Sequence, residues 1–381
     1  MKILFVSIPN HHFFQWANQL KESDFDVYWF DITDGAGFSN KIGWIKQFNG
    51  WKLKWDFPLR HRLKKWFPII YKCIQKVNEN KVERMFNDVV KKLQPDVIHC
   101  FEMNLSGIPI LSVLEKHSSI KFVYSSWGSD LYDFKSFGLT KLQVTHFLYR
   151  VDYLITDCDR DYQLAILYGF TNNFLGVFPG NGGISIPVQA IFPSENRNLI
   201  LIKGYDDGVG KASVVLHALE NLPKSILSSY EIIVFSADIT VKPIIEQSEI
   251  LSQLNLQVFP RSQHITNEEI LRMMGNSVVY IGNSLSDGMP NTLLESMGMG
   301  AFPIQSNPGG ATEEVLQHGV NGYLIAFPEN IIDIAHLIER ALINFALRKT
   351  AQDYNVAFID KHYNRSALKP RIVTLYNNLL K

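Results

Sequence analysis

The chain has 381 residues, 46% of them hydrophobic and 19% charged, a composition typical of a folded globular protein of two or three domains. Lys and Arg together number 37, as do Asp and Glu, so no overall charge draws the chain to nucleic acid. No apolar run approaches the roughly 18 residues that span a bilayer, and three separated cysteines indicate neither a disulfide framework nor a zinc site. We therefore expect a cytoplasmic protein.

The N-terminal half alternates short apolar runs with helical stretches. We expect strands at residues 2–7, 26–31, 96–100, 121–125 and 153–156. Strands that alternate with helices in this way form a parallel sheet with crossover connections. The proline-containing segment 184–198 is the expected link to a second series of strands, at residues 199–202, 231–235, 256–259 and 278–281. The pattern predicts an α/β protein with two such domains facing each other across a cleft.

Residues 41–72 form the strongest compositional anomaly. They contain nine Lys and Arg and one acid, Asp56, and four of the seven tryptophans, Trp44, Trp51, Trp55 and Trp66. Cations mixed with tryptophan suit an anionic bilayer, because the cations meet headgroups while the rings lie at the interface. We expect this segment to dock the first domain on an anionic membrane surface. A nucleic-acid arm and a packed aromatic cluster are the alternatives.

The sequence Asp157-Cys158-Asp159 has the D-x-D spacing of metal-dependent transferases of a different fold. It lies where a strand gives way to a helix, and helix capping accounts for both acids. We therefore expect no metal site here.

The second domain opens with a glycine-containing loop between Lys203 and Lys211. Its glycines, Gly204, Gly208 and Gly210, allow the backbone to approach a phosphate closely. The spacing is not that of a P-loop. A flexible surface loop with solvated lysines is the alternative.

Residues 284–314 contain two strand-turn-helix cycles. In the first, an apolar run is followed by a turn at Asp287-Gly288, Pro290 in the first helical turn and a helix from Asn291. The second has a strand at 301–305, a turn and a helix at 311–317. Ligands bind where the strands of such a sheet end.

Two carboxylates distinguish the first cycle. A helical Cα–Cβ bond tilts toward the helix start, so Glu295 on the second turn can lean toward the loop that carries Asp287. Carboxylates accept hydrogen bonds from vicinal hydroxyls, and the amides of a helix start attract phosphate. The alternative is two solvated surface acids.

The run SDGMPNTLLESMGMGAFPI, residues 286–304, resembles the acid-x7-acid signature of glycosyltransferase family 4. This resemblance implies a retaining enzyme of the GT-B fold that uses a nucleotide-sugar donor. It implies three parts: an acceptor-side Rossmann-like domain at 1–187, a nucleotide-sugar domain at 188–355, and a C-terminal helix within 356–381 that crosses back to the first domain. The first acid of the family is usually Glu, and the Asp287 side chain is one methylene shorter.

The resemblance also assigns residue roles. Its catalytic set is Lys203, Lys211, Asp287 and Asp130, with the two lysines on the donor diphosphate. Its donor-binding set is Glu295 on the ribose, Arg261 beside the base, Gly204, and the loop and helix start Gly288, Met289, Pro290, Asn291 and Thr292. Its acceptor-side set is His11, His99, Glu102 and Trp127. Each of three residues has an alternative role. Asp130 could cap a turn, Arg261 could be an exposed loop residue, and His99 could be a buried, hydrogen-bonded ring.

The predicted function is transfer of a sugar from a UDP- or GDP-linked donor to a glycan or lipid-linked acceptor in cell-surface polysaccharide biosynthesis. No metal or other cofactor is expected. The protein is expected at the inner face of the cytoplasmic membrane. A nucleotide-sugar epimerase of the same architecture and a non-catalytic nucleotide-sugar-binding protein are the alternatives.

Overall fold

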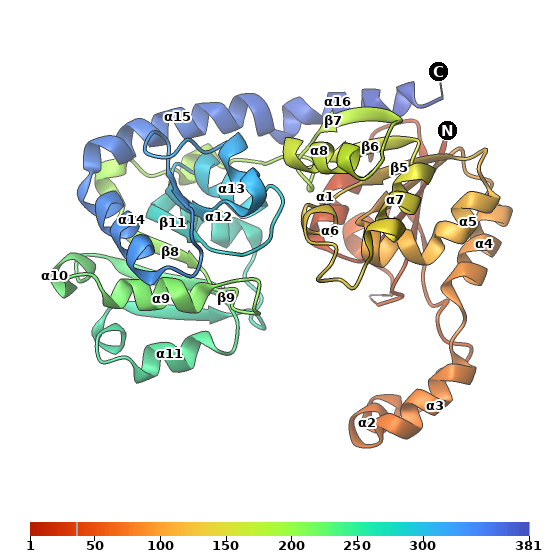
Figure 1. The fold of residues 1–381 in the computed structure, drawn as a ribbon, viewed down its shortest axis with the longest axis horizontal. Coiled ribbons are helices and arrows are strands. Elements are labelled where there is room, and N and C mark those ends of the chain that lie inside the picture. The colour runs from red at the N-terminus through yellow and green to blue at the C-terminus, as the bar shows by residue number, and fades with distance from the viewer. Residues whose placement is uncertain (36, 381) are drawn as a thin grey trace. The chain divides into compact units, whose positions relative to one another are not determined.

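Residues 1–35 and 37–380 are described by the computed structural model, apart from the side chain of His61 (Figure 1). The chain divides into two compact units. The first comprises Met1–Thr156, Tyr162–Gly182 and Ile372–Lys381, and the second comprises Asp157–Asp161 and Gly183–Arg371. The segment 184–198 therefore lies within the second unit.

The first unit contains seven parallel strands in the order β3-β2-β1-β4-β5-β6-β7. They are β1 (Lys2–Ser7), β2 (Asp26–Asp31), β3 (Lys46–Phe48), β4 (Val97–Phe101), β5 (Lys121–Ser125), β6 (Tyr153–Thr156) and β7 (Asn173–Val177). The five expected strands are present within one residue of their expected bounds. The edge strands β3 and β7 were not expected, because neither has an unbroken apolar run.

The helices between these strands follow the α/β pattern. They are α1 (His11–Asn18), α2 (Arg60–Trp66), α3 (Pro68–Asn78), α4 (Val82–Leu93), α5 (Leu111–Lys116), α6 (Ser129–Tyr132), α7 (Lys141–Arg150) and α8 (Asp159–Leu167). The end of the chain packs into this unit, where Trp16 Nε1 donates to the Tyr376 hydroxyl at 2.9 Å.

The second unit contains six parallel strands in the order β10-β9-β8-β11-β12-β13. They are β8 (Leu199–Lys203), β9 (Glu231–Ala237), β10 (Leu256–Pro260), β11 (Ser277–Gly282), β12 (Phe302–Ser306) and β13 (Tyr323–Ile325). The helices are α9 (Ala212–Glu220), α10 (Lys224–Leu227), α11 (Val241–Gln247), α12 (Asn267–Asn276), α13 (Asn291–Gly298), α14 (Ile331–Ile343) and α15 (Phe345–Tyr363). The last helix, α16 (Arg365–Asn378), begins in this unit and ends in the first, which includes Ile372–Lys381. The predicted α/β fold is confirmed.

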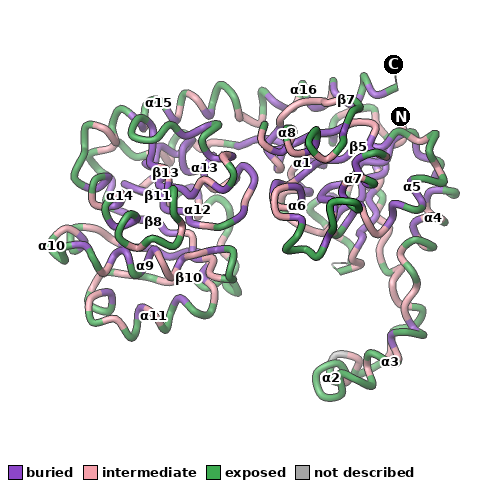
Figure 2. Tube along the Cα trace, in the orientation of Figure 1, coloured by how far each residue is buried: buried purple, intermediate pink, exposed green. Residues whose placement is uncertain are grey.

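The central strands are buried on both faces. Every residue of β11 is buried, as are the first four residues of β8 (Figure 2). A parallel sheet covered on both faces requires strands that are continuously apolar, and this is why these runs are readable in the sequence.

In each sheet the strand order reverses at one place. In the second unit the reversal lies between β8 and β11, so the loops that follow these two strands diverge. Ligands bind at the carboxyl ends of the strands at such a point. Both candidate donor loops, after β8 and after β11, lie there.

Two local expectations were wrong. The helix expected at 311–317 is a single 3₁₀ turn, Thr312–Glu314, so the acids there do not begin an α-helix. Pro290 is the N-cap of α13 in an extended conformation rather than a residue of its first turn. Over residues 1–35 and 37–380, no helix combines the length and the hydrophobicity needed to cross a membrane.

Candidate active site

The loop between β11 and α13 places Asp287 beside a cation. Asp287 is half-buried, and its Oδ1 accepts a hydrogen bond from the Gly288 amide at 3.0 Å. Burial raises the pKa of its carboxyl group, against the positive charges of Lys203 and Arg160. Asp287 and Lys203, 84 residues apart in the chain, are therefore close enough to interact electrostatically.

Glu295, on the second turn of α13, is more deeply buried, with 7% of its surface exposed. Burial raises the pKa of its carboxyl group to about 7, against a hydrogen bond from the Asn267 side chain and the charges of Arg365 and Lys203. Lys203 thus acts on both carboxyl groups. The expectation that Asp287 and Glu295 serve one site stays a prediction. The interaction of both carboxyl groups with Lys203 supports it.

The loop after β8 carries an aromatic ring between two cations. Lys203 Nζ lies 4.7 Å from the Tyr205 ring centroid, and the Arg261 guanidinium lies 4.2 Å from the same centroid. Arg261 also pairs with Asp207 and Asp238, each at 3.4 Å. The aromatic contacts hold Arg261 at this end of the sheet although about half of its side chain is exposed. Sequence reasoning missed Tyr205.

The second predicted diphosphate cation lies farther along the same loop. Lys211 is the N-cap residue of α9, and its amide donates to the Asn283 carbonyl at 3.0 Å, which joins the loop after β8 to the loop after β11. Its ammonium pairs with Glu329 at 2.8 Å. Glu329 is largely exposed, so this pair costs little to separate and leaves Lys211 available for an anion.

The structure gives Gly204 a packing role. A Cβ added at Gly204 would lie 2.6 Å from Ala237 Cα, so the residue is a glycine because β9 approaches it closely. The expectation that Gly204 also lets a phosphate approach the backbone stays a prediction.

The loop from Gly288 to Thr292 is only partly available to a ligand. Met289 is buried, and its amide donates to Asp157 Oδ2 at 3.2 Å, so it is not free to bind a donor, which corrects the expectation for Met289. The Thr292 hydroxyl accepts from Tyr280 at 2.8 Å, and Pro290 has no amide hydrogen. The first-turn amides of α13 are the part of this loop suited to an anion.

The segment Asp157–Asp161 braces this loop, which the sequence did not predict. A Cβ on Gly288 would lie 2.1 Å from Asp157 Oδ2, so only glycine allows this approach. Arg160 donates to the Asp287 carbonyl at 2.9 Å and to the Pro308 carbonyl at 2.7 Å. Asp157 and Arg160 therefore fix the backbone that carries the Asp287 carboxylate.

Asp157, Cys158 and Asp161 are buried and place their ligand atoms within 4.8 Å of one another. The Asp161 carboxylate pairs with Arg160 at 2.7 Å, and Asp157 accepts from Met289. Through these contacts the two acids hold the loop in place. The expectation that no metal binds stays a prediction.

The structure corrects two expectations in the first unit. His99 is fully buried in β4, and its ring nitrogens lie 2.6 Å from the Tyr376 hydroxyl and 2.7 Å from Ser125 Oγ. Burial lowers its pKa to about 3, so it is a neutral core histidine and cannot contact an acceptor. Asp130 is also buried and accepts from Tyr124 Oη at 2.6 Å and from the Met103 and Trp127 amides. It orders the loop instead of reacting.

Glu102 is buried next to this loop. Its carboxylate accepts from the Asn104 and Leu105 amides, and it caps the turn Met103–Gly107. Burial and the charge of Asp130 raise the pKa of its carboxyl group to about 8. This corrects its acceptor-side role, because its oxygen atoms serve the backbone.

The two remaining acceptor-side candidates lie nearer the surface of the first unit. His11 is exposed at the start of α1. The Trp127 indole Nε1 is buried without a hydrogen-bond partner, and a Cβ on Gly180 would lie 3.3 Å from the Trp127 ring. An unpaired buried donor is costly, so Trp127 Nε1 is the acceptor-side atom that stands out.

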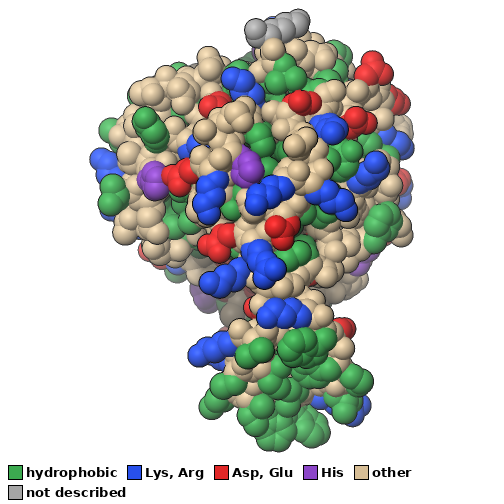
Figure 3. Space-filling view, turned by 90° about the vertical axis from the view of Figure 1, so that its right-hand side faces the viewer, with side chains coloured by type: hydrophobic (Ala, Val, Ile, Leu, Met, Phe, Trp, Pro, Cys, Tyr) green, Lys and Arg blue, Asp and Glu red, His purple; other side chains and the backbone are tan. Residues whose placement is uncertain are grey.

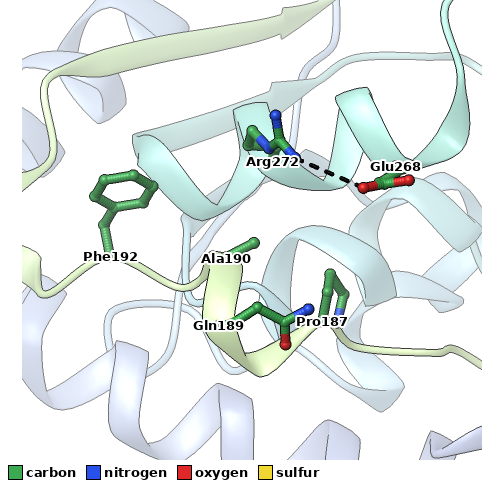
Figure 4. Close-up of a pocket in the computed structure, with 6 residues that line it drawn as sticks. All are labelled: Pro187, Gln189, Ala190, Phe192, Glu268 and Arg272. Carbon is green, nitrogen blue, oxygen red and sulfur yellow. Dashed lines mark ion pairs between the residues drawn. The ribbon is translucent and has the colours of Figure 1, made fainter.

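None of these residues lines the cavity that Figure 4 shows in the second unit. It has a volume of about 180 Å³, below the range typical of ligand sites, and it is lined by Pro187, Gln189, Ala190, Phe192, Glu268 and Arg272. Its one ion pair, Arg272 with Glu268 at 3.6 Å, is exposed. We therefore do not identify it with the site.

Comparisons with known proteins agree with this fold. The profile of Glycosyl transferases group 1 matches residues 189–356, and the profile of Glycosyl transferase 4-like proteins matches residues 2–158. No curated protein matches the chain by sequence.

Several solved structures share the fold. Sucrose-phosphate synthase (tll1590) from Thermosynechococcus elongatus has 14% identity and a TM-score of 0.74, over 100% of this chain and 99% of that one. Alr3699/HepE of Anabaena in complex with UDP has 14% identity and a TM-score of 0.71, over 99% and 100%. The lipopolysaccharide outer core galactosyltransferase WaaB has 15% identity and a TM-score of 0.67, over 100% and 99%.

Proposed function

We propose that the chain, which matches the glycosyl transferases of group 1 over residues 189–356 and the glycosyl transferase 4-like proteins over residues 2–158, is a retaining enzyme with a UDP- or GDP-linked sugar donor. Its proposed acceptor is a glycan or a lipid-linked sugar in cell-surface polysaccharide biosynthesis. One observation carries the donor assignment: Lys203 acts on two carboxyl groups, Asp287 and Glu295, at the carboxyl ends of β8 and β11. A nucleotide sugar offers a diphosphate for the cation and two sets of hydroxyls for the carboxylates.

The donor then binds in three parts. Glu295 accepts hydrogen bonds from the ribose hydroxyls, and Asp287 accepts them from the sugar. Lys203, Lys211 and the first-turn amides of α13 bind the diphosphate. Arg261 and Tyr205 lie farther along the same edge, where an aromatic ring beside a guanidinium suits a base.

The bond that breaks joins the sugar to the diphosphate. Its cleavage leaves negative charge on the diphosphate, and fixed cations stabilise this charge where it develops. In a same-face substitution, a donor phosphate oxygen takes the proton of the acceptor hydroxyl. The acceptor oxygen bonds to the anomeric carbon on the face that the diphosphate leaves.

The test is a screen of nucleotide sugars against the full-length protein, with thermal stability and release of free nucleotide diphosphate as readouts. UDP-sugars come first, since Alr3699/HepE, a structural neighbour, is described with UDP. We expect the sugars of one nucleotide to raise the melting temperature. We also expect slow hydrolysis of that nucleotide sugar. Glu295→Gln is expected to weaken both effects, whereas Glu249→Gln, at an exposed position of the same unit, is expected to keep them.

The other outcomes identify the alternatives. Conversion of the donor sugar to an isomer, without free nucleotide diphosphate, would make the protein an epimerase. Binding without hydrolysis or transfer would make it a non-catalytic binding protein. Failure of every nucleotide sugar to bind would refute the proposed site.

A further inference from the structure

A helical hairpin, residues 53–79, projects from the first unit and contains α2 and α3 (Figure 1). Hydrogen bonds join the two strands of chain at its base. Leu53 pairs with Glu79 in an antiparallel bridge, and the Lys54 amide donates to the Asn78 carbonyl at 2.8 Å. The Asn78 side chain is buried and bonds to the Trp55 amide and carbonyl, at 3.0 and 2.8 Å. The hairpin is therefore held in place by its base.

The structure divides the basic, tryptophan-containing segment 41–72 into two parts. Trp51 stacks on Phe30 at 5.2 Å and donates to the Asp31 carbonyl, and Trp44 donates to Asn18. These two tryptophans belong to the body of the unit, which corrects the expectation that the whole segment meets a membrane. Only the hairpin remains as a candidate surface.

The far end of the hairpin exposes large apolar side chains, and Figure 3 shows them gathered there. Trp66 is 69% exposed and Ile69 is 77% exposed, at the junction of α2 and α3. The neighbouring exposed apolar residues are Leu59, Phe67 and Ile70. Clustered apolar exposure of this kind marks an interaction surface.

The same hairpin is strongly basic. Its residues, 53–79, contain seven Lys and Arg and two acids, Asp56 and Glu79, and Asp56 pairs with Arg60 at 3.3 Å. Lys64 and Lys65 lie in the last turn of α2, next to the apolar end. Cations therefore surround an apolar end on an element that is anchored only at its base.

We propose that the hairpin inserts its apolar end into the surface of an anionic lipid bilayer, with its lysines and arginines among the headgroups. A bilayer surface stabilises this arrangement, because Trp lies at the interface, aliphatic side chains lie below it and cations contact the headgroups. A nucleic acid would give exposed Ile69 and Ile70 nothing apolar to contact. A second copy would bring two strongly positive hairpins together, and like charges oppose that contact.

The test uses the full-length protein with a fluorophore on Cys73, an exposed position on α3; Cys100 and Cys158 are buried. Vesicles of phosphatidylcholine alone are compared with vesicles that also contain phosphatidylglycerol. We expect a blue shift and co-flotation with the anionic vesicles, both weakened when salt rises from about 0.1 M to about 1 M. Lys64→Gln with Lys65→Gln is expected to weaken binding about 30-fold.

The apolar contribution is tested separately with Trp66→Ser and Ile69→Ser. These variants are expected to lose the blue shift, whereas Ile239→Ser, at a 93% exposed position of the second unit, is expected to keep it. Lys349→Gln with Lys361→Gln is the matched charge control at exposed positions. Circular dichroism confirms that each variant is folded.

Three results would overturn the proposal: no binding to anionic vesicles, binding unchanged by both sets of hairpin variants, or a dimer that the hairpin variants dissociate. Nucleotide-sugar binding without vesicles is expected to be equal in all variants. That readout separates a failure here from a failure of the proposed function.

Discussion

Glu295→Gln removes the most deeply buried carboxyl group of the candidate site. Its pKa rises from an ordinary value of 4.5 to about 7, chiefly because of burial, which corresponds to about 3 kcal/mol. Between these two values the unfolded chain releases the proton while the folded protein keeps it. The stabilising contribution of the protonated group is therefore complete below pH 4.5 and is lost as pH rises through about 7.

Glutamine resembles the protonated acid in shape and does not titrate. We therefore expect the free energy of unfolding of the wild type, minus that of Glu295→Gln, to fall by about 3 kcal/mol from below about pH 4.5 to above about pH 7.5. The subtraction cancels the titration of the other groups. At the same time the variant should lose nucleotide-sugar affinity by about tenfold or more, because a charge-assisted hydrogen bond is lost.

Urea titrations at several pH values measure this difference. All seven tryptophans lie between residues 16 and 127, so tryptophan fluorescence follows the first unit, while far-UV circular dichroism follows both. We expect the dichroism transition to change and the fluorescence transition to keep its midpoint. Glu249→Gln, the same substitution at an exposed position of the second unit, is the matched control. A pH-independent difference for Glu295→Gln would refute our account of the buried carboxyl group.

Gly288→Ala places a Cβ 2.1 Å from Asp157 Oδ2, so the donor loop must shift; we expect about tenfold weaker nucleotide-sugar binding by calorimetry. Lys203→Ala removes the cation that the Asp287 and Glu295 carboxyl groups share. It should weaken binding at least about tenfold and move the pH dependence described above to higher pH, because the charge of Lys203 lowers the pKa of Glu295. Tyr376→Phe leaves two buried ring nitrogens without their hydroxyl partner and should destabilise the first unit by about 1–3 kcal/mol, read by tryptophan fluorescence in urea.

Matched variants control these three. Gly43→Ala adds a Cβ that meets only ordinary contacts, the nearest at 3.5 Å, and should bind donor normally. Lys349→Ala and Tyr354→Phe remove a side-chain group at exposed positions. Unchanged donor binding in both Gly288→Ala and Lys203→Ala would remove the loop after β11 from the site. A Tyr376→Phe protein as stable as the wild type would show that its hydroxyl is not needed in the core.

The sequence predicted the fold because the central strands are buried on both faces. Such strands must be apolar along their whole length, as in residues 199–202, and that pattern is visible without tertiary information. The spacing of Asp287 and Glu295 was readable for a similar reason, because helix geometry relates a loop to the second turn that follows it. The capping box of Thr266 and Glu269 at the start of α12 has the same local origin.

Burial and long-range contact were not readable. Asp157 braces Met289 across 132 residues, and the D-x-D spacing gave no sign of that role. His99 is a core residue because Tyr376, 277 residues later, bonds to its ring. Trp51 and Trp66 look alike in a basic segment, yet one packs on Phe30 and the other is exposed.

The sequence by itself thus determined the apolar central strands of both sheets, the two acids after β11 and the basic character of the hairpin. These are properties of residues near one another in the chain, where periodicity and helix geometry act. Only the tertiary structure decided which acids are buried beside Lys203, which histidine is in the core, and which tryptophans face solvent. Those properties depend on segments that meet only after the chain has folded, so no local pattern records them.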